Sequence, residues 1–101
     1  MSIIYEVTLH VDAGIADEYD AWLEEHIREM HELPGFVGSE KFAVEPEEAS
    51  PARVGRVVHY RLESREAFDD YLRDHADRMR DKGLERFAGH FSASRRILHP
   101  M

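Results

Sequence analysis

With 101 residues, the chain has the size of one compact domain, and its 43% hydrophobic content is too high for a disordered protein. The absence of cysteine excludes disulfides, iron–sulfur clusters and thiolate zinc sites. A formal net charge of −8 argues against a nucleic-acid-binding module, which needs a basic surface to replace the counterions of the phosphates.

The N-terminal segment Ile3–Val11 alternates between apolar and mixed positions, which predicts a strand with one strongly apolar face. The chain start lacks the basic region and the cleavage site of a signal peptide, and its apolar run is too short to span a bilayer. We therefore expect a soluble, cytoplasmic protein without membrane contact. Asp12 is expected to cap the helix that follows.

From Ile15 to about Leu33, apolar side chains recur at three- and four-residue spacing. This spacing predicts an amphipathic helix, which stops at Pro34-Gly35. A weaker second strand is predicted at Phe36–Val44. The segment Glu45–Arg53 contains two prolines and several acids, which indicates a loop and the most mobile part of the chain.

A second helix is predicted between two further strands. The third strand is expected at Val54–Leu62, and Ser64 is expected to cap the helix. Gly83 is expected to end the helix in a left-handed turn, and a short turn at Leu84–Gly89 leads to a final strand at Phe91–Leu98. The predicted inner face of the helix consists of seven side chains: Ala67, Phe68, Tyr71, Leu72, His75, Ala76 and Met79.

The predicted order of elements, β-α-β-β-α-β, is the ferredoxin-like arrangement of a single α+β domain over residues 1–101. Its four-stranded antiparallel sheet carries both helices on one face and leaves the other face bare. Because apolar side chains such as Ile4 and Val57 lie on that bare face, we expect a second copy to cover it, as a homodimeric α/β barrel.

Two twelve-residue segments, Tyr19–Met30 and Phe68–Met79, echo one another across the two halves. The identical pairs are Asp20/Asp69, Leu23/Leu72, His26/His75 and Met30/Met79. Apolar matches follow from any two helices that share an apolar stripe, but a shared histidine does not. The echo therefore indicates a duplicated unit and places one imidazole on the inner face of each helix.

His26 and His75 are the candidate catalytic residues, because an unperturbed histidine pKa of about 6.5 suits a general base. The alternative is that both histidines are structural and bond to a backbone carbonyl or to an acid such as Glu6. The expected walls of a small-molecule pocket between helices and sheet are aromatic: Trp22, Tyr60 and Tyr71.

A metal site is a weaker interpretation. None of the seven histidines stands in an HxxxH, HxH or HExxH spacing. A site built from His26, His75 and Glu6 is geometrically conceivable, but nothing in the spacing requires it. We expect no bound metal and no cofactor.

The open sheet face is expected to present five polar side chains from the central strands: Glu6, Thr8, His10, His59 and Arg61. We expect Arg61 to pair with Glu6 in a network that fixes dimer register, or to contact a ligand inside the barrel. Arg95 and Arg96 must point to opposite faces of the last strand, which leaves one of them for an anion or for the solvated surface.

Charge is distributed unevenly along the chain. Residues 1–52 hold 2 basic and 13 acidic side chains, a formal charge of −11, and residues 53–101 hold 11 basic and 8 acidic ones, a charge of +3. One interpretation is an acidic solvated face on the first helix and a mixed one on the second. The other is that the basic half contacts the acidic half of a partner subunit, or an anionic ligand.

The stretch Val57–Met79 looks like the third strand and second helix of the dimeric α/β-barrel superfamily, which includes antibiotic-biosynthesis-type and haem-degrading monooxygenases and muconolactone-isomerase-like enzymes. Over nearly the whole chain, IIYEVTL, WLEEHIREM, LPGF, YRLESREAF, YLRDHADRM, RF-x-G-x-F and SRRIL resemble an uncharacterised bacterial family, the domain of unknown function 4286. The resemblance implies the fold but no particular activity, because the superfamily hosts oxygenases, isomerases and non-catalytic proteins.

Haem-degrading members of the superfamily use an Asn in the first strand, with a Trp and a haem-ligating His in the second helix. This chain has Glu6 and Thr8 on its first strand and contains no Asn. Its second helix carries Tyr71 and His75 but no Trp. Haem oxygenation is therefore not expected.

These observations leave two functional hypotheses. The first is a small-molecule-binding protein or cofactor-independent enzyme, monooxygenase- or isomerase-like, with a pocket between helices and sheet. The second is a non-catalytic homodimeric interaction module with structural histidines. A cavity of about 300 Å³ that both imidazoles face would favour the first.

Overall fold

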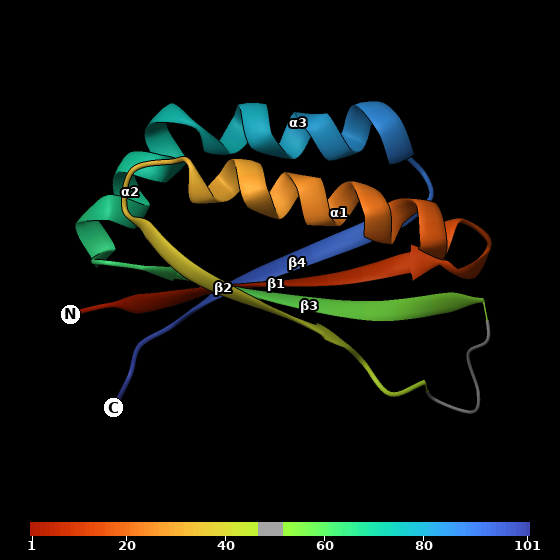
Figure 1. Ribbon diagram of the computed structural model, residues 1–101, viewed down its shortest axis with the longest axis horizontal. Coiled ribbons are helices and arrows are strands. Elements are labelled where there is room, and N and C mark those ends of the chain that lie inside the picture. Colours follow the sequence, from red (N-terminus) through yellow and green to blue (C-terminus); the bar gives the residue numbers. More distant parts are fainter. Residues whose placement is uncertain (47–51) are drawn as a thin grey trace.

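The computed structural model describes residues 1–46 and 52–101 (Figure 1). Residues 47–51 of the predicted loop Glu45–Arg53 lie outside the described residues, so its predicted mobility stays a prediction. The elements in chain order are β1 (Ile3–Asp12), η1 (Ala13–Ile15), α1 (Ala16–His31), β2 (Phe36–Ala43), β3 (Arg53–Leu62), α2 (Arg65–Asp74), α3 (Ala76–Phe87) and β4 (Phe91–Leu98).

The four strands form one antiparallel sheet in the order β2-β3-β1-β4, with the helices on one face (Figure 1). This arrangement confirms the predicted ferredoxin-like fold. The two central strands are β1 and β3, as expected. None of the helices in the described part of the chain is long and apolar enough to cross a membrane.

Strand register separates the two faces of the sheet. Tyr5 of β1 lies opposite Tyr60 of β3 and Ile97 of β4, and all three belong to the core beneath the helices or pack against it. Their sequence neighbours point to the other face, which no element of the described chain covers (Figure 1). The alternation read from Ile3–Val11 is thus confirmed.

The second predicted helix is two helices. The helix is interrupted at His75, whose φ of −134° is not helical. His75 therefore ends α2 and precedes α3. Helix α2 buries only Phe68 and Tyr71. Leu72, which was predicted on the inner face, is exposed although it lies within α2, ahead of the break.

The prediction that Gly83 ends the second helix is wrong, and the turn expected at Leu84–Gly89 begins later than predicted. Helix α3 continues through both positions to Phe87, and the left-handed residue is Gly89, with φ +84°. Gly83 is buried in the helix interior, where an added Cβ would lie 3.1 Å from Cη2 of Trp22. The glycine is required by the close approach of α3 to α1 and not by a turn.

Two capping predictions have different outcomes. Ser64 caps α2 as predicted, because its hydroxyl accepts the Ala67 N–H at 3.0 Å. Asp12 makes no capping hydrogen bond. Its carboxylate instead accepts from Arg53 Nε at 3.1 Å and lies 3.2 Å from His90 Nδ1, which ties β1 to the ends of β3 and β4.

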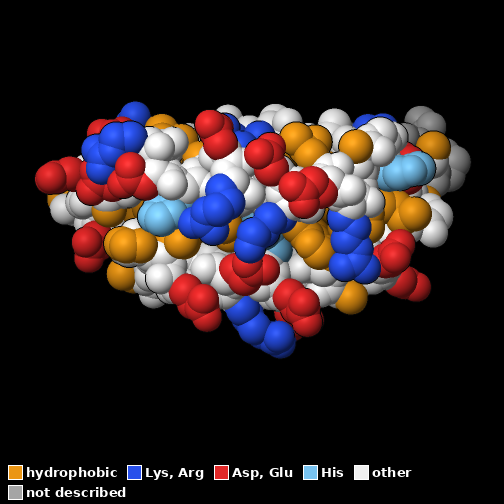
Figure 2. Space-filling view, turned by 90° about the horizontal axis from the view of Figure 1, so that it is seen from above, with side chains coloured by type: hydrophobic (Ala, Val, Ile, Leu, Met, Phe, Trp, Pro, Cys, Tyr) orange, Lys and Arg blue, Asp and Glu red, His pale blue; other side chains and the backbone are white. Residues whose placement is uncertain are grey.

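Acidic and basic side chains are intermixed on the helix face of the molecule (Figure 2). Several ion pairs join the acidic first half of the chain to the basic second half. Glu29 of α1 pairs with Lys82 of α3, and Asp20 of α1 accepts two hydrogen bonds from Arg56 of β3. Part of the charge asymmetry is therefore neutralised within the chain.

Candidate functional site

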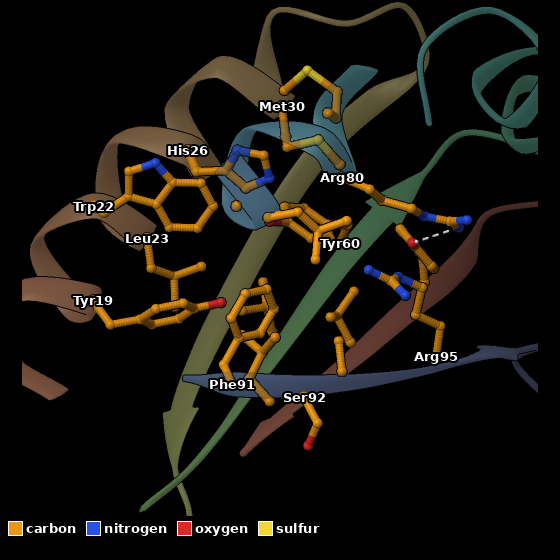
Figure 3. Close-up of a pocket in the computed structure, with 18 of the residues that line it drawn as sticks. Tyr19, Trp22, Leu23, His26, Met30, Tyr60, Arg80, Phe91, Ser92 and Arg95 are labelled. Carbon is orange, nitrogen blue, oxygen red and sulfur yellow. Dashed lines mark hydrogen bonds between the residues drawn. The ribbon is translucent and has the colours of Figure 1, made fainter. Parts of the chain in front are cut away.

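A cavity of about 310 Å³ lies between the helices and the sheet (Figure 3). Leu84 of α3 and Arg95 of β4 are exposed members of its lining, so the cavity opens between these two elements. Its volume is at the lower end of the range for small-molecule sites. The aromatic side chains that line it are Tyr5, Tyr19, Trp22, Tyr60, Tyr71 and Phe91.

Trp22 and His26, one helical turn apart on α1, form one wall of the cavity. Their rings are stacked, with centroids 4.7 Å apart and an interplanar angle of 15°. Nδ1 of His26 is buried and has no hydrogen-bond partner in the described part of the chain. Burial lowers the pKa of His26, which Glu29 opposes and Lys82 reinforces, so the imidazole is neutral at pH 7.

Tyrosine hydroxyls supply the neutral polar groups of the cavity. Burial raises the pKa of Tyr19 to about 12, against the opposing positive charge of Arg95, and Figure 3 shows its hydroxyl pointing into the cavity. Burial likewise raises the pKa values of Tyr60 and Tyr71. These phenols stay protonated near neutral pH and can donate hydrogen bonds to a bound molecule.

Two arginines contribute the charge. Arg80 of α3 donates from Nη2 to the Tyr5 hydroxyl at 3.3 Å, while its buried Nε has no partner among the described residues. Arg95 of β4 faces the cavity, whereas Arg96 points to the opposite side of the sheet and binds Glu6. The predicted divergence of Arg95 and Arg96 is confirmed. Among the described residues, no Asp or Glu lines the cavity.

The structure brings together most of the predicted site residues but not all of them. Trp22, His26, Tyr60 and Tyr71 line the cavity, as expected. His75 does not: it lies at the junction of α2 and α3, where Arg78 donates to its Nδ1 at 2.7 Å. The equivalence that the sequence echo suggested is lost because only one of the two histidines lies inside a continuous helix.

Arg61, predicted to pair with Glu6, does not pair with it in the described structure, and its predicted contact with a ligand stays a prediction. It is exposed on the open sheet face, opposite Ile4, and does not line the cavity. Glu6 instead lies opposite both His59 and Arg96, receives a hydrogen bond from Arg96, and lies 2.7 Å from His59 Nε2. Register decides the partner, because Arg61 is two residues further along the strand.

Arg80 was not among the candidate residues, and Arg95 was considered only as one of two arginines that could bind an anion. A recognisable signal for Arg80 was its position three residues before Gly83, on the same side of a helix that was expected to end at Gly83. For Arg95 the alternation of β4 left two candidates, and the choice between them needed the register with β1. Within residues 1–46 and 52–101, no three His, Asp or Glu side chains cluster as a metal site would require.

The fold is similar to that of solved structures that include monooxygenases. SnoaB, a cofactor-independent oxygenase from Streptomyces nogalater, is 13% identical with a TM-score of 0.65, over 100% of this chain and 95% of that one. An antibiotic biosynthesis monooxygenase is 12% identical with a TM-score of 0.66, over 98% of each chain. An ethyl tert-butyl ether d family protein from Bacillus halodurans is 10% identical with a TM-score of 0.70, over 98% of this chain and 99% of that one.

At these identities the likeness establishes the fold and not the chemistry. The sequence matches none of the curated proteins. One family model matches residues 2–101, which is nearly the full length of the chain. The protein therefore belongs to the family described as domain of unknown function DUF4286.

Proposed function

We propose that the protein binds a small aromatic molecule in the helix–sheet cavity and acts on it without a dedicated cofactor, in a monooxygenase- or isomerase-like reaction with His26 as general base. The observation that carries this proposal is the position of His26 in the wall of an aromatic cavity of about 310 Å³. Its Nδ1 is buried and has no partner among the described residues, so the base would act through the part of the imidazole that is exposed in the cavity wall.

The electrostatics of the cavity support proton transfer. A neutral imidazole can accept a proton from a phenol or from a carbon acid, and the lowered pKa of His26 keeps it neutral at pH 7. The oxyanion that results would be stabilised by tyrosine hydroxyls such as that of Tyr19, and by the cationic side chains of the cavity. Proton removal of this kind is the first step both of isomerisation and of direct oxygenation of an electron-rich aromatic.

One of the proteins with a similar fold, SnoaB, is a cofactor-independent oxygenase. The fold is therefore compatible with the proposed reaction. The proposal does not extend to His75. That imidazole is turned toward Arg78, away from the cavity, and accepts a hydrogen bond where a base would need a free lone pair. A catalytic role for His75 stays a prediction from the sequence alone.

A homodimer is part of this proposal, formed through the open sheet face. Phe42 of β2 is 44% exposed on that face and lies opposite Val57 of β3, and Val44 beside them is 45% exposed. The Glu6, His59 and Arg96 cluster lies on the same side of the sheet. An apolar patch next to a paired polar cluster suits an interface between two identical copies.

The second candidate function is a non-catalytic homodimeric module, and the pairing of His75 with Arg78 favours it for one histidine. The two candidates differ in whether His26 contacts a ligand. A thermal-shift and NMR screen with phenols, naphthols and quinols tests this difference in the wild-type protein, in His26→Gln and in the matched control His75→Gln. Binding that weakens in His26→Gln but not in His75→Gln supports the proposal. Absence of any binding would favour the module.

A further inference from the structure

We propose that Arg80 and Arg95 form an anion-binding end of the cavity, and that the natural ligand is a planar aromatic carboxylate. This inference rests on the proposed ligand site and specifies the chemical class of its ligand. Figure 3 shows the two guanidinium groups toward one end of the cavity, where Arg80 bonds to Tyr5, and Trp22 toward the other end. The cavity therefore has a cationic end and an aromatic end.

The charge balance of the cavity differs from that of the rest of the molecule. Six arginines of the described chain form ion pairs with acids: Arg53, Arg56, Arg65, Arg73, Arg86 and Arg96. Arg80 and Arg95, like Arg28, Arg61 and Arg78, form no such pair within the described residues, although the chain carries 21 acids against 13 bases. No carboxylate of the described chain lines the cavity to neutralise them.

Arg80 in particular is held in position but incompletely satisfied. Its Nη2 is fixed by the Tyr5 hydroxyl, and its Nε is buried without a partner among the described residues. The buried Nε is closed to an incoming molecule, so the guanidinium would meet an acceptor through those donors of its outer nitrogens that Tyr5 does not occupy. Arg95 belongs to a different element, so two cations converge from opposite walls, and both their charges reach Tyr71, where they counteract the effect of burial on its hydroxyl.

The shape and size of the cavity narrow the class of anion. A carboxylate is planar and carries two acceptor oxygens, so one carboxylate can accept hydrogen bonds from Arg80 and Arg95 together. The remaining wall is aromatic and apolar, so the rest of the ligand must be a flat, uncharged ring system. A volume of about 310 Å³ has room for one or two fused rings, not for a large cofactor or a nucleotide.

The experiment compares 2-naphthoate with 2-naphthamide, which has nearly the same shape but no charge. Binding is followed by the NMR signal of the indole N–H, because Trp22 is the one tryptophan of the chain and lines the cavity. Titration calorimetry supplies the affinities. The variants are Arg80→Gln and Arg95→Gln, with Arg61→Gln as a control that removes the same charge from the open sheet face.

The expected result is that wild-type protein binds naphthoate about tenfold or more tightly than naphthamide, since charged hydrogen bonds are worth more than neutral ones. Arg80→Gln and Arg95→Gln should each remove most of this preference, and Arg61→Gln should retain it. Arg95 is exposed, so its replacement keeps the test valid even if Arg80→Gln fails to fold.

Other outcomes separate the two proposals. Equal binding of naphthoate and naphthamide, both shifting the Trp22 signal, would overturn the anion class and leave the aromatic site intact. An equal loss in Arg61→Gln would also overturn it, because general attraction of anions would then explain the preference. Tighter binding of 2-naphthyl phosphate than of naphthoate would overturn the proposal that the anionic group of the ligand is a carboxylate. No binding of any probe, with an unmoved Trp22 signal, would contradict the ligand site itself.

Discussion

The imidazole of His26 lies nearly parallel to the indole of Trp22, with ring centroids 4.7 Å apart. The stack covers one face of the imidazole and fixes its orientation at the cavity wall. Because Nδ1 is buried and has no partner among the described residues, protonation of the ring would place an uncompensated charge beside an aromatic surface. The neutral imidazole is thus favoured by the fold.

This relationship predicts a pH dependence of stability that originates from His26. Burial lowers its pKa in the folded state, so the stability it contributes is complete above the unfolded pKa of about 6.5 and is lost as pH falls through the folded pKa. In urea unfolding, wild-type protein should lose more free energy of unfolding between about pH 7 and pH 5 than His26→Gln does. His75→Gln should keep the wild-type dependence. An NMR titration midpoint of His26 at or above the unfolded pKa would contradict the prediction.

The close approach of Gly83 to Trp22 makes a second prediction. A Cβ at position 83 would lie 3.1 Å from the Trp22 ring and 3.6 Å from Cζ of Phe91, so a branched side chain must displace the stack. Gly83→Val should lower the free energy of unfolding by about 1–3 kcal/mol, as overpacked core positions do. It should also shift the Trp22 indole N–H signal. Glu85→Val, exposed on the same helix, should do neither.

Much of the fold was predictable because alternation and helical periodicity are local. The strand Ile3–Asp12 and the helix Ala16–His31 follow from such patterns, and a nearly complete match to one family supports the same topology. The break at His75 was not predictable. Its neighbours Asp74 and Ala76 do not interrupt a helix by themselves, so the break depends on how α2 and α3 pack.

The site was less predictable than the fold, because it depends on the register between strands and on how closely the helices approach one another. Alternation shows that Glu6, His59 and Arg61 share a face, but a shift of two residues changes which cation pairs with the carboxylate. Gly83 has the local properties of a helix end, yet it accommodates Trp22 from another helix.

The apolar patch on the open sheet face predicts that a single charge introduced there disrupts the proposed homodimer. Phe42→Glu would place a carboxylate next to Val57 in the proposed interface, and we expect it to convert a dimer into a monomer in analytical ultracentrifugation. Leu84→Glu introduces the same charge on the helix side, at a leucine that is 52% exposed, and should leave the mass unchanged. A wild-type monomer at high concentration would contradict the proposed homodimer.

Glu6 predicts a separate dependence of stability in acid. Hydrogen bonds from Arg96 and from His59 hold the pKa of Glu6 below its usual 4.5, so the stability it contributes is present above that value and is lost as pH falls through the folded pKa. Glu6→Gln should lower the free energy of unfolding at neutral pH by about 1 kcal/mol, since an amide accepts these hydrogen bonds more weakly. The variant should also lose less stability than wild type below about pH 4.5. Glu85 makes no ion pair among the described residues, so the control variant Glu85→Gln should match the wild type in both respects. A Glu6→Gln protein with the full acid sensitivity of the wild type would show that other carboxylates account for it.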